Sequence, residues 1–188
     1  MELTTKQQTQ LLQLARGAIK DLFRKPEVQF ETYAADPAFR LHAGAFVTIT
    51  QLGELRGCIG FIVADKELYK TIYEAAQLAA SEDPRFPPVN EGEVDGLSIE
   101  ISVLSPPEPL GSYDEIVIGK HGLIVREGFA SGLLLPQVPV EHNMDRDEYL
   151  TAICRKAGLP ANRWREKQLE LQAFTAHVFS EDDKETEV

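Results

Sequence analysis

The first part of the chain has the hydrophobic pattern of an amphipathic helix. Apolar residues recur at three- and four-residue spacing from Leu11 to Phe23, which is the period of one helix face. Thr4 and Gln7 have the spacing of a capping box, in which each side chain bonds the other residue's backbone N–H. The pattern predicts a helix over residues 5–24, which ends before Pro26.

A β-hairpin is predicted next. Residues 45–51 are rich in β-branched side chains, Leu52-Gly53 supplies a turn, and residues 54–63 form the returning strand. The preceding segment, 27–41, has no clear period and is predicted to be irregular, with a turn at Asp36-Pro37.

A helix, a stiff loop and a strand follow the hairpin. An apolar stripe predicts a helix that is capped by Asp65 and ends near Ser81. Three prolines in the loop at 83–88 restrict the backbone, so Arg85 and Phe86 should be held in place. Strict alternation over residues 97–105 predicts a half-buried strand.

Short strands and glycines dominate the next part of the chain. Strands are predicted at 116–118, 123–126 and 133–138, and this glycine-rich stretch forms either a small lobe or an excursion from the main sheet. After it come a helix that starts at Asp145 and ends before Gly158, a short helix at 163–168 and a final strand at 169–179.

These elements predict an α+β fold with a mainly antiparallel sheet and flanking helices. The 188 residues are enough for one domain with a sizeable core, which we expect to cover residues 1–180, with 110–144 as the candidate small lobe. The acidic run from Glu181 to Glu187 predicts a solvated, flexible tail over 181–188.

Charge and cysteine content exclude some functions. The 19 basic and 30 acidic residues give a net charge of −11, which argues against nucleic acids and anionic membrane surfaces as partners. No apolar run approaches the roughly 20 residues that span a bilayer, and no secretory signal is evident. Two cysteines give neither a disulfide framework nor a metal-binding spacing, so we expect a reduced, cytoplasmic protein.

The most unusual stretch is Leu55-Arg56-Gly57-Cys58-Ile59-Gly60. In a regular strand, Glu54, Arg56 and Cys58 share one face, while Leu55, Gly57, Ile59 and Phe61 form an apolar face toward the core. Two glycines in a strand indicate a close approach of backbone or ligand, or a bulge. We expect the functional site here.

Cys58 is the main candidate for catalysis. A nearby cation such as Arg56 favours the nucleophilic thiolate. His121 is the candidate acid/base, with Glu54, Glu100 or Asp83 to orient it. The alternative is that Cys58 is a small buried apolar residue, as Cys154 is expected to be beside Leu150 and Ile153.

Arg56 and Arg85 are candidates for binding a carboxylate or phosphate by bidentate hydrogen bonds. They are equally well explained as structural ion pairs with Glu54, Glu100 or Asp83. Phe86 is favoured as a core residue over a stacking platform for substrate. The four histidines are scattered, and the glycine-rich stretch has no nucleotide-binding pattern, so we expect no metal and no cofactor.

Six segments in order resemble the AMMECR domain family, which in many bacteria and archaea is protein A of the AmmeMemoRadiSam system. They cover nearly the whole chain: 55–60 (LRGCIG), 83–88 (DPRFPP), 101–106 (ISVLSP), 120–123 (KHGL), 132–138 (GLLLPQV) and 156–160 (KAGLP). One departure is Met144, where the family often has a tryptophan shortly before the aspartate. Methionine can fill the same apolar gap.

The resemblance implies a mixed α and β fold with an antiparallel sheet, and a smaller lobe that forms a cleft with the main body. It also implies partners, namely a Memo-type protein, which resembles metal-dependent ring-cleaving dioxygenases, and a radical-SAM enzyme. It assigns no settled activity.

Two functions are therefore open. The first is an enzyme that acts on a small-molecule ligand, best suited to acyl or amide hydrolysis through Cys58, or an enzyme subunit whose active site the Memo-type partner completes. The second is a non-catalytic binding module for that partner, in which Arg56, Arg85 and Phe86 belong to the interface or to the fold.

Overall fold

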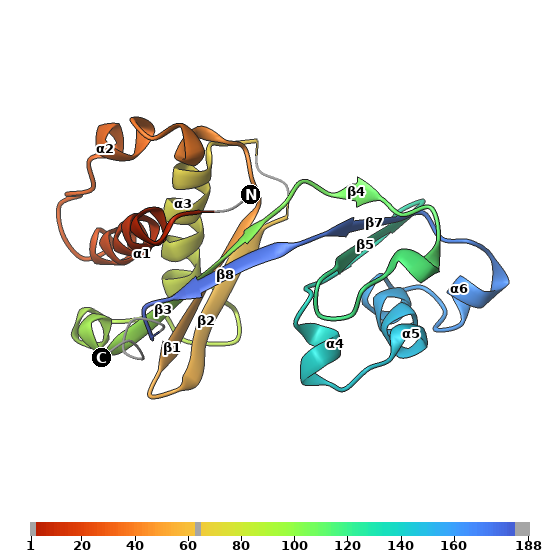
Figure 1. Cartoon of the computed structure of the whole chain (residues 1–188). Coiled ribbons are helices and arrows are strands. Elements are labelled where there is room, and N and C mark those ends of the chain that lie inside the picture. The colour runs from red at the N-terminus through yellow and green to blue at the C-terminus, as the bar shows by residue number, and fades with distance from the viewer. Residues whose placement is uncertain (1–2, 63–64, 183–188) are drawn as a thin grey trace. The chain divides into compact units, whose positions relative to one another are not determined.

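The computed structural model describes residues 3–62 and 65–182, and the chain forms two compact units. The first unit contains residues 1–104 and 177–188, and the second contains residues 105–176 (Figure 1). Each unit has its own four-stranded sheet and its own helices. The α+β class expected from the sequence is confirmed.

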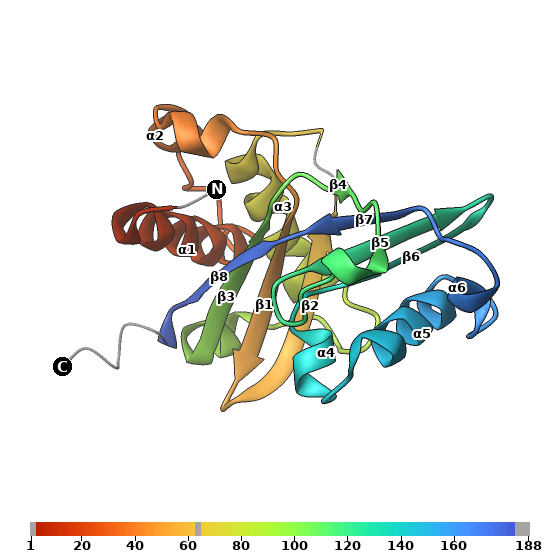
Figure 2. The same ribbon diagram turned by 45° about the vertical axis from the view of Figure 1, so that its right-hand side comes forward.

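The first sheet has the strand order β2-β1-β3-β8, and β1 pairs antiparallel with both β2 and β3. Helix α3 packs against β1 and β2, and helix α1 packs against α3 and β3 (Figures 1 and 2). The bounds are α1 (Thr5–Lys20), α3 (Leu68–Ser81), β1 (Ala45–Gln51), β2 (Glu54–Phe61), β3 (Leu97–Leu104) and β8 (Ala176–Ser180).

Helix α1 starts with the capping box that the sequence predicts. The Thr4 side chain accepts the Gln7 N–H, and the Gln7 side chain accepts the Thr4 N–H. The helix ends at Lys20, one turn earlier than predicted. The following segment is not irregular throughout, because it contains the short helices α2 (Phe30–Ala34) and η1 (Pro37–Arg40).

The predicted cap of α3 is wrong. Its N-cap is Glu67, and Asp65 lies two residues before it. Glu67 is held in an extended conformation, where it forms an isolated bridge with His42. Since the backbone becomes helical only after this bridge, Asp65 cannot occupy the capping position.

The hairpin of β1 and β2 contains a bulge at Arg56. Leu52 and Gly53 form the turn with positive φ angles of 54° and 82°, as two-residue hairpin turns require. Thr50 pairs with Leu55 but Ile49 pairs with Gly57, so Arg56 has no partner on β1. Because of this extra residue, the residues before Gly57 point to the faces of the sheet opposite those predicted for a regular strand.

Leu55 and Glu54 therefore do not lie on the predicted faces. Leu55 pairs with Thr50 on the face opposite the helices and is 40% exposed, so it does not join the core. Glu54 pairs with Gln51 beside the turn and does not share the face of Cys58. Ile59 and Phe61 do pack against the core, as expected.

The second sheet has the order β4-β7-β5-β6, and all its pairs are antiparallel. Helix α5 covers one face, where Leu123 and Val125 join the core residues Tyr149, Leu150 and Ile153. The bounds are β4 (Glu108–Pro109), η3 (Tyr113–Glu115), β5 (Gly122–Glu127), β6 (Ala130–Leu134), α4 (Val138–Glu141), α5 (Arg146–Lys156), α6 (Arg163–Glu166) and β7 (Leu171–Phe174).

This unit is larger than the lobe expected at 110–144, because α5 and β7 pack on β5 and β6. Residues 116–118 are not a strand, but the Asp145 cap of α5 is confirmed with Glu148 as its partner. Met144 packs partly buried against this core, which is the role expected of it.

The predicted final strand is divided between the two sheets. β7 pairs with β4 and β5, whereas β8 lies beside β3. Glu181 is not part of a flexible tail, because Arg16 Nε donates to it at 2.8 Å and it also accepts the Ile99 N–H. Residues 183–188 of the predicted tail lie outside the described residues.

No helix among the described residues is long and apolar enough to span a membrane.

Candidate functional site

Cys58 lies on β2, on the face of the sheet opposite α3. Its neighbour Gly57 faces the helix so closely that a β-carbon there would lie 2.1 Å from the carbonyl oxygen of Ala79. Only glycine permits this approach. With Gly57 directed at α3, Cys58 is directed away from it and lies opposite Thr48 of β1.

Each polar group of Cys58 has a contact. The Thr48 hydroxyl donates to Cys58 Sγ at 3.3 Å, and the Cys58 N–H donates to Asp83 Oδ2 at 2.8 Å. Arg85 Nη2 lies 3.4 Å from the Cys58 carbonyl oxygen. The thiol is half-buried, and its position is fixed from two strands and one loop.

Asp83 and Arg85 form the polar centre of this site. Arg85 donates to the Asp83 carboxylate through Nε at 3.0 Å and Nη2 at 2.7 Å. The Asp83 side chain is only 2% exposed, whereas the Arg85 side chain is 54% exposed. A buried carboxylate thus holds one side of a guanidinium whose remainder faces solvent.

The electrostatics follow from this pairing. The Arg85 guanidinium holds the pKa of the Asp83 carboxyl well below its usual range, and the N–H groups of Cys58 and Arg85 act in the same direction, against the effect of burial. The pKa of Arg85 is raised, above all by its hydrogen bond to Asp83. Burial of the guanidinium acts against this rise.

Arg56 has a different set of partners from those expected. Its Nε donates to Glu93 at 2.9 Å, and its two terminal nitrogens donate to the backbone carbonyls of Pro87 and Pro88 at 2.7 and 3.2 Å. The side chain is 13% exposed. Since most of its donors are engaged, Arg56 joins β2 to the proline loop and presents little surface to a ligand.

Phe86 and Glu54 have separate surroundings. Phe86 is half-buried and lies outside the hydrophobic core cluster, with the Arg85 guanidinium 5.5 Å from its ring centroid. The prediction that it fills the core is not supported. Glu54 is exposed beside the hairpin turn, four residues or about 13 Å along the strand from Cys58.

His121 belongs to the second unit, whereas Cys58 belongs to the first. Its Nδ1 accepts the backbone N–H of Val117 at 3.4 Å. In the neutral imidazole this places the proton on Nε2, which is then a hydrogen-bond donor. Lys120, His121, Glu108 and Glu115 line a cavity of about 410 Å³ within this unit.

The residues of the predicted site are thus only partly brought together. Cys58, Arg85 and Phe86 lie at one place, Arg56 supports the same loop, and Glu54 lies further along the strand. Thr48 and Glu93 were missed. Regular counting from the turn places Val47 opposite Cys58, and the bulge at Arg56 replaces it with Thr48.

Within the described ranges, 3–62 and 65–182, no three His, Cys, Asp or Glu side chains are grouped closely enough to hold a metal ion.

Comparison of the chain with known proteins identifies its family. The family model described as AMMECR1 matches residues 12–179. The chain belongs to the AMMECR1 family. The resemblance drawn from the sequence motifs is confirmed.

Similar AMMECR1 proteins occur in archaea. A protein of Thermococcus gammatolerans is 43% identical over 182 residues, covering 92% of this chain and 89% of its own length. Protein MJ0810 of Methanocaldococcus jannaschii is 39% identical over 194 residues, covering 99% of this chain and 96% of its own.

The same fold is present in a solved structure. The crystal structure of the uncharacterized protein PH0010 from Pyrococcus horikoshii has a TM-score of 0.81 and 40% identity, covering 92% of this chain and 90% of that chain. AMMECR1 membership therefore establishes the fold but no activity, and a function has to be inferred from the site.

Proposed function

We propose that this protein binds a small molecule that carries a negative charge and an acyl group, and that Cys58 attacks the acyl carbon. The observation behind this proposal is the half-exposed guanidinium of Arg85, which lies 3.4 Å from the carbonyl oxygen of Cys58, the residue that carries the half-buried thiol. Asp83 fixes the guanidinium from its buried side, so its remaining donors are available to a carboxylate or phosphate.

The Thr48 hydroxyl gives Cys58 one feature of a nucleophile's surroundings. A thiolate is the reactive form of cysteine, and Thr48 donates a hydrogen bond to the sulfur at 3.3 Å. Asp83 is not suited to be the base, because it is buried, ion-paired and holds its proton only weakly. The thiol proton is therefore released to solvent.

The reaction has two steps. The Cys58 sulfur forms a bond to the acyl carbon of an ester or thioester, and the bond to the leaving group breaks with its electron pair, which takes a proton from water. A water molecule then attacks the thioester, releases the carboxylic acid and restores the thiol. Arg85 binds the charged end of the acyl group in both steps.

The acid/base role of His121 stays a prediction. As long as Nδ1 accepts the Val117 N–H, the neutral ring donates from Nε2 and cannot accept a proton there. The hydrolysis rate of His121→Ala tests that role, and an unchanged rate would reject it.

Alkylation and hydrolysis test the proposal together. Iodoacetamide should label native Cys58 faster than Cys154, which is fully buried and whose pKa is raised by that burial. Wild-type protein should hydrolyse succinyl thioesters faster than acetyl thioesters, and Arg85→Gln should remove the difference. Labelling of Cys58 only after denaturation excludes nucleophilic catalysis.

A second proposal is that the protein docks on a Memo-type protein and either completes its active site or acts only as a binding module. The exposed Arg85 and the half-buried Phe86 favour it. They lie on a loop that is stiffened by prolines and held by Arg56, and aromatic and arginine side chains on a rigid surface are typical interface anchors. Arg85→Glu should abolish co-purification, and Cys58→Ser should not. An unchanged complex with Arg85→Glu rejects this surface.

A further inference from the structure

The second unit has a groove on the face of its sheet that points away from α5. Ile124 and Arg126 alternate along β5 with the two residues that are buried beneath α5, so they point to the other face. Gln172 of β7 pairs with Ile124. These residues, with Pro109, Leu110 and segment 168–171, line a groove of about 420 Å³.

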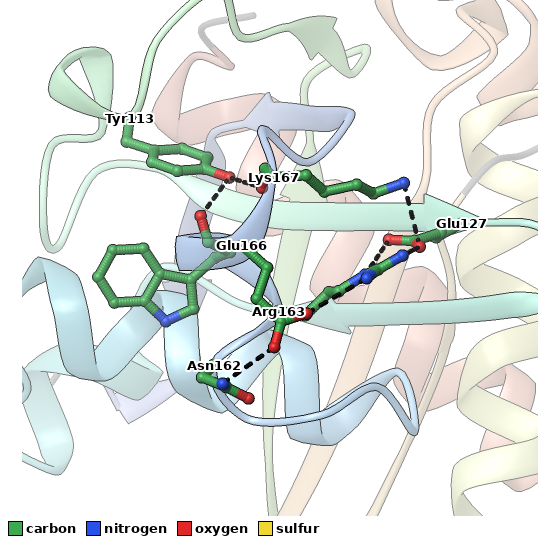
Figure 3. Close-up of polar contacts among 7 residues, drawn as sticks. Tyr113, Glu127, Asn162, Arg163, Glu166 and Lys167 are labelled. Atoms are coloured by element: carbon green, nitrogen blue, oxygen red, sulfur yellow. Dashed lines mark hydrogen bonds and ion pairs between the residues drawn. The ribbon is translucent and has the colours of Figure 1, made fainter.

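The walls of this groove are held by hydrogen bonds. The Tyr113 hydroxyl accepts the Leu169 N–H at 2.8 Å and lies 3.4 Å from the Lys167 carbonyl, which it faces in Figure 3. The Leu110 N–H donates to the Leu171 carbonyl at 2.9 Å. The groove is therefore formed before any ligand arrives, which lowers the entropic cost of binding.

The charges around Glu127 are already paired. Figure 3 shows Glu127 between Arg163 and Lys167, whose nitrogens lie 2.6 and 3.1 Å from its carboxylate. These two cations, Arg163 above all, lower the pKa of Glu127. Since successive strand residues point to opposite faces, this cluster lies across the sheet from Arg126.

Arg126 and Glu170 differ from the residues around Glu127 in their exposure and in their ion pairing. Both are exposed and line the groove, and neither forms an ion pair or side-chain hydrogen bond with any residue in the described part of the chain. The groove is also lined by the apolar side chains of Pro109 and Leu110 and by Gln172, together with Ile124, which is only 3% exposed. One unpaired cation and one unpaired anion thus border an apolar groove.

We propose that this groove binds a free amino acid with an apolar side chain. Its carboxylate is recognised by the Arg126 guanidinium, its ammonium group by the Glu170 carboxylate, and its side chain by the accessible apolar surfaces of Pro109 and Leu110. The volume is at the small end of the range for ligand sites, about 300–1,000 Å³.

This site is independent of the function proposed for Cys58, which lies in the other unit.

The experiment is a titration of the ¹⁵N-labelled full chain with L-phenylalanine, followed by amide chemical shifts. The amides of Ile124, Leu171 and Gln172 should shift and saturate. 3-Phenylpropionate, which lacks the ammonium group, and phenethylamine, which lacks the carboxylate, should each bind about tenfold more weakly, a difference of about 1.4 kcal/mol.

Variants identify the two charged contacts. Arg126→Gln should weaken L-phenylalanine binding without affecting phenethylamine, and Glu170→Gln should weaken it without affecting 3-phenylpropionate. Arg155→Gln, which removes another unpaired exposed cation of the same unit, is the control and should bind normally. Absence of saturable shifts at these amides, or equal binding of all three probes, overturns the proposal even if a variant does not fold.

Discussion

The carboxylate of Asp83 accepts the backbone N–H of Cys58 at 2.8 Å and the guanidinium of Arg85 at 2.7 Å. One buried side chain thus joins the strand that carries the thiol to the loop that carries the cation. Because a carboxylate accepts several hydrogen bonds at once, a single residue can set the distance between two candidate functional groups.

Replacement of Asp83 by asparagine should destabilise the protein by about 3 kcal/mol, because it removes charge-assisted bonds from a buried site. Urea denaturation measures this loss. The exposed carboxylate of Asp95, which lies 3.6 Å from Lys20, provides the control, and Asp95→Asn should change the unfolding free energy little.

The pH dependence of stability should come partly from Asp83. Its pKa is depressed in the folded protein, so its contribution is present above the unfolded value of about 3.9 and is lost as the pH falls below it toward the folded value. Acid unfolding of Asp83→Asn should therefore be less steep below about pH 4 than that of the wild type. Parallel curves for the two proteins would contradict this.

Arg56→Lys should loosen the proline loop while keeping the charge. Lysine cannot donate to Glu93 and to the Pro87 and Pro88 carbonyls at once, so we expect a loss of about 2 kcal/mol. Hydrogen exchange should become faster at the Val89 amide, which bonds to the Ala80 carbonyl. The control is Arg24→Lys, an exposed pair with Glu91 in the same unit.

Gly57→Ala should be strongly destabilising. The new methyl group would lie 2.1 Å from the Ala79 carbonyl oxygen, so β2 or α3 must move, at a cost of about 3 kcal/mol. Gly96→Ala is a matched control, since its nearest atom would be 3.9 Å away. If both variants melt at the wild-type temperature, the close packing of α3 on β2 is wrong.

Tyr149→Phe tests how the His121 loop is held. The buried Tyr149 hydroxyl lies 3.2 Å from the His121 carbonyl and 3.3 Å from that of Leu134, and burial raises its pKa. The variant should lose about 1 kcal/mol and show faster exchange at the His121 amide. Tyr33→Phe, whose hydroxyl has no hydrogen bond among the described residues, should change neither quantity.

Local patterns in the sequence were sufficient to predict several elements of the fold. The capping box at Thr4, the turn at Leu52 and Gly53 and the cap at Asp145 depend on residues within a few positions of one another. Helical and strand periods likewise need only the adjacent sequence. The α+β class and the position of the candidate thiol could be predicted for this reason.

Tertiary structure decided the surroundings of that thiol. The bulge at Arg56 changes which residue lies opposite Cys58. Arg56 forms its ion pair with Glu93, 37 positions away, and not with any of the acidic residues that the sequence suggested. Pairing between strands and contacts between distant segments depend on how whole elements pack, and no period in the sequence records that packing. The sequence by itself therefore determined most of the elements and the candidate thiol, whereas packing decided which side chains surround that thiol.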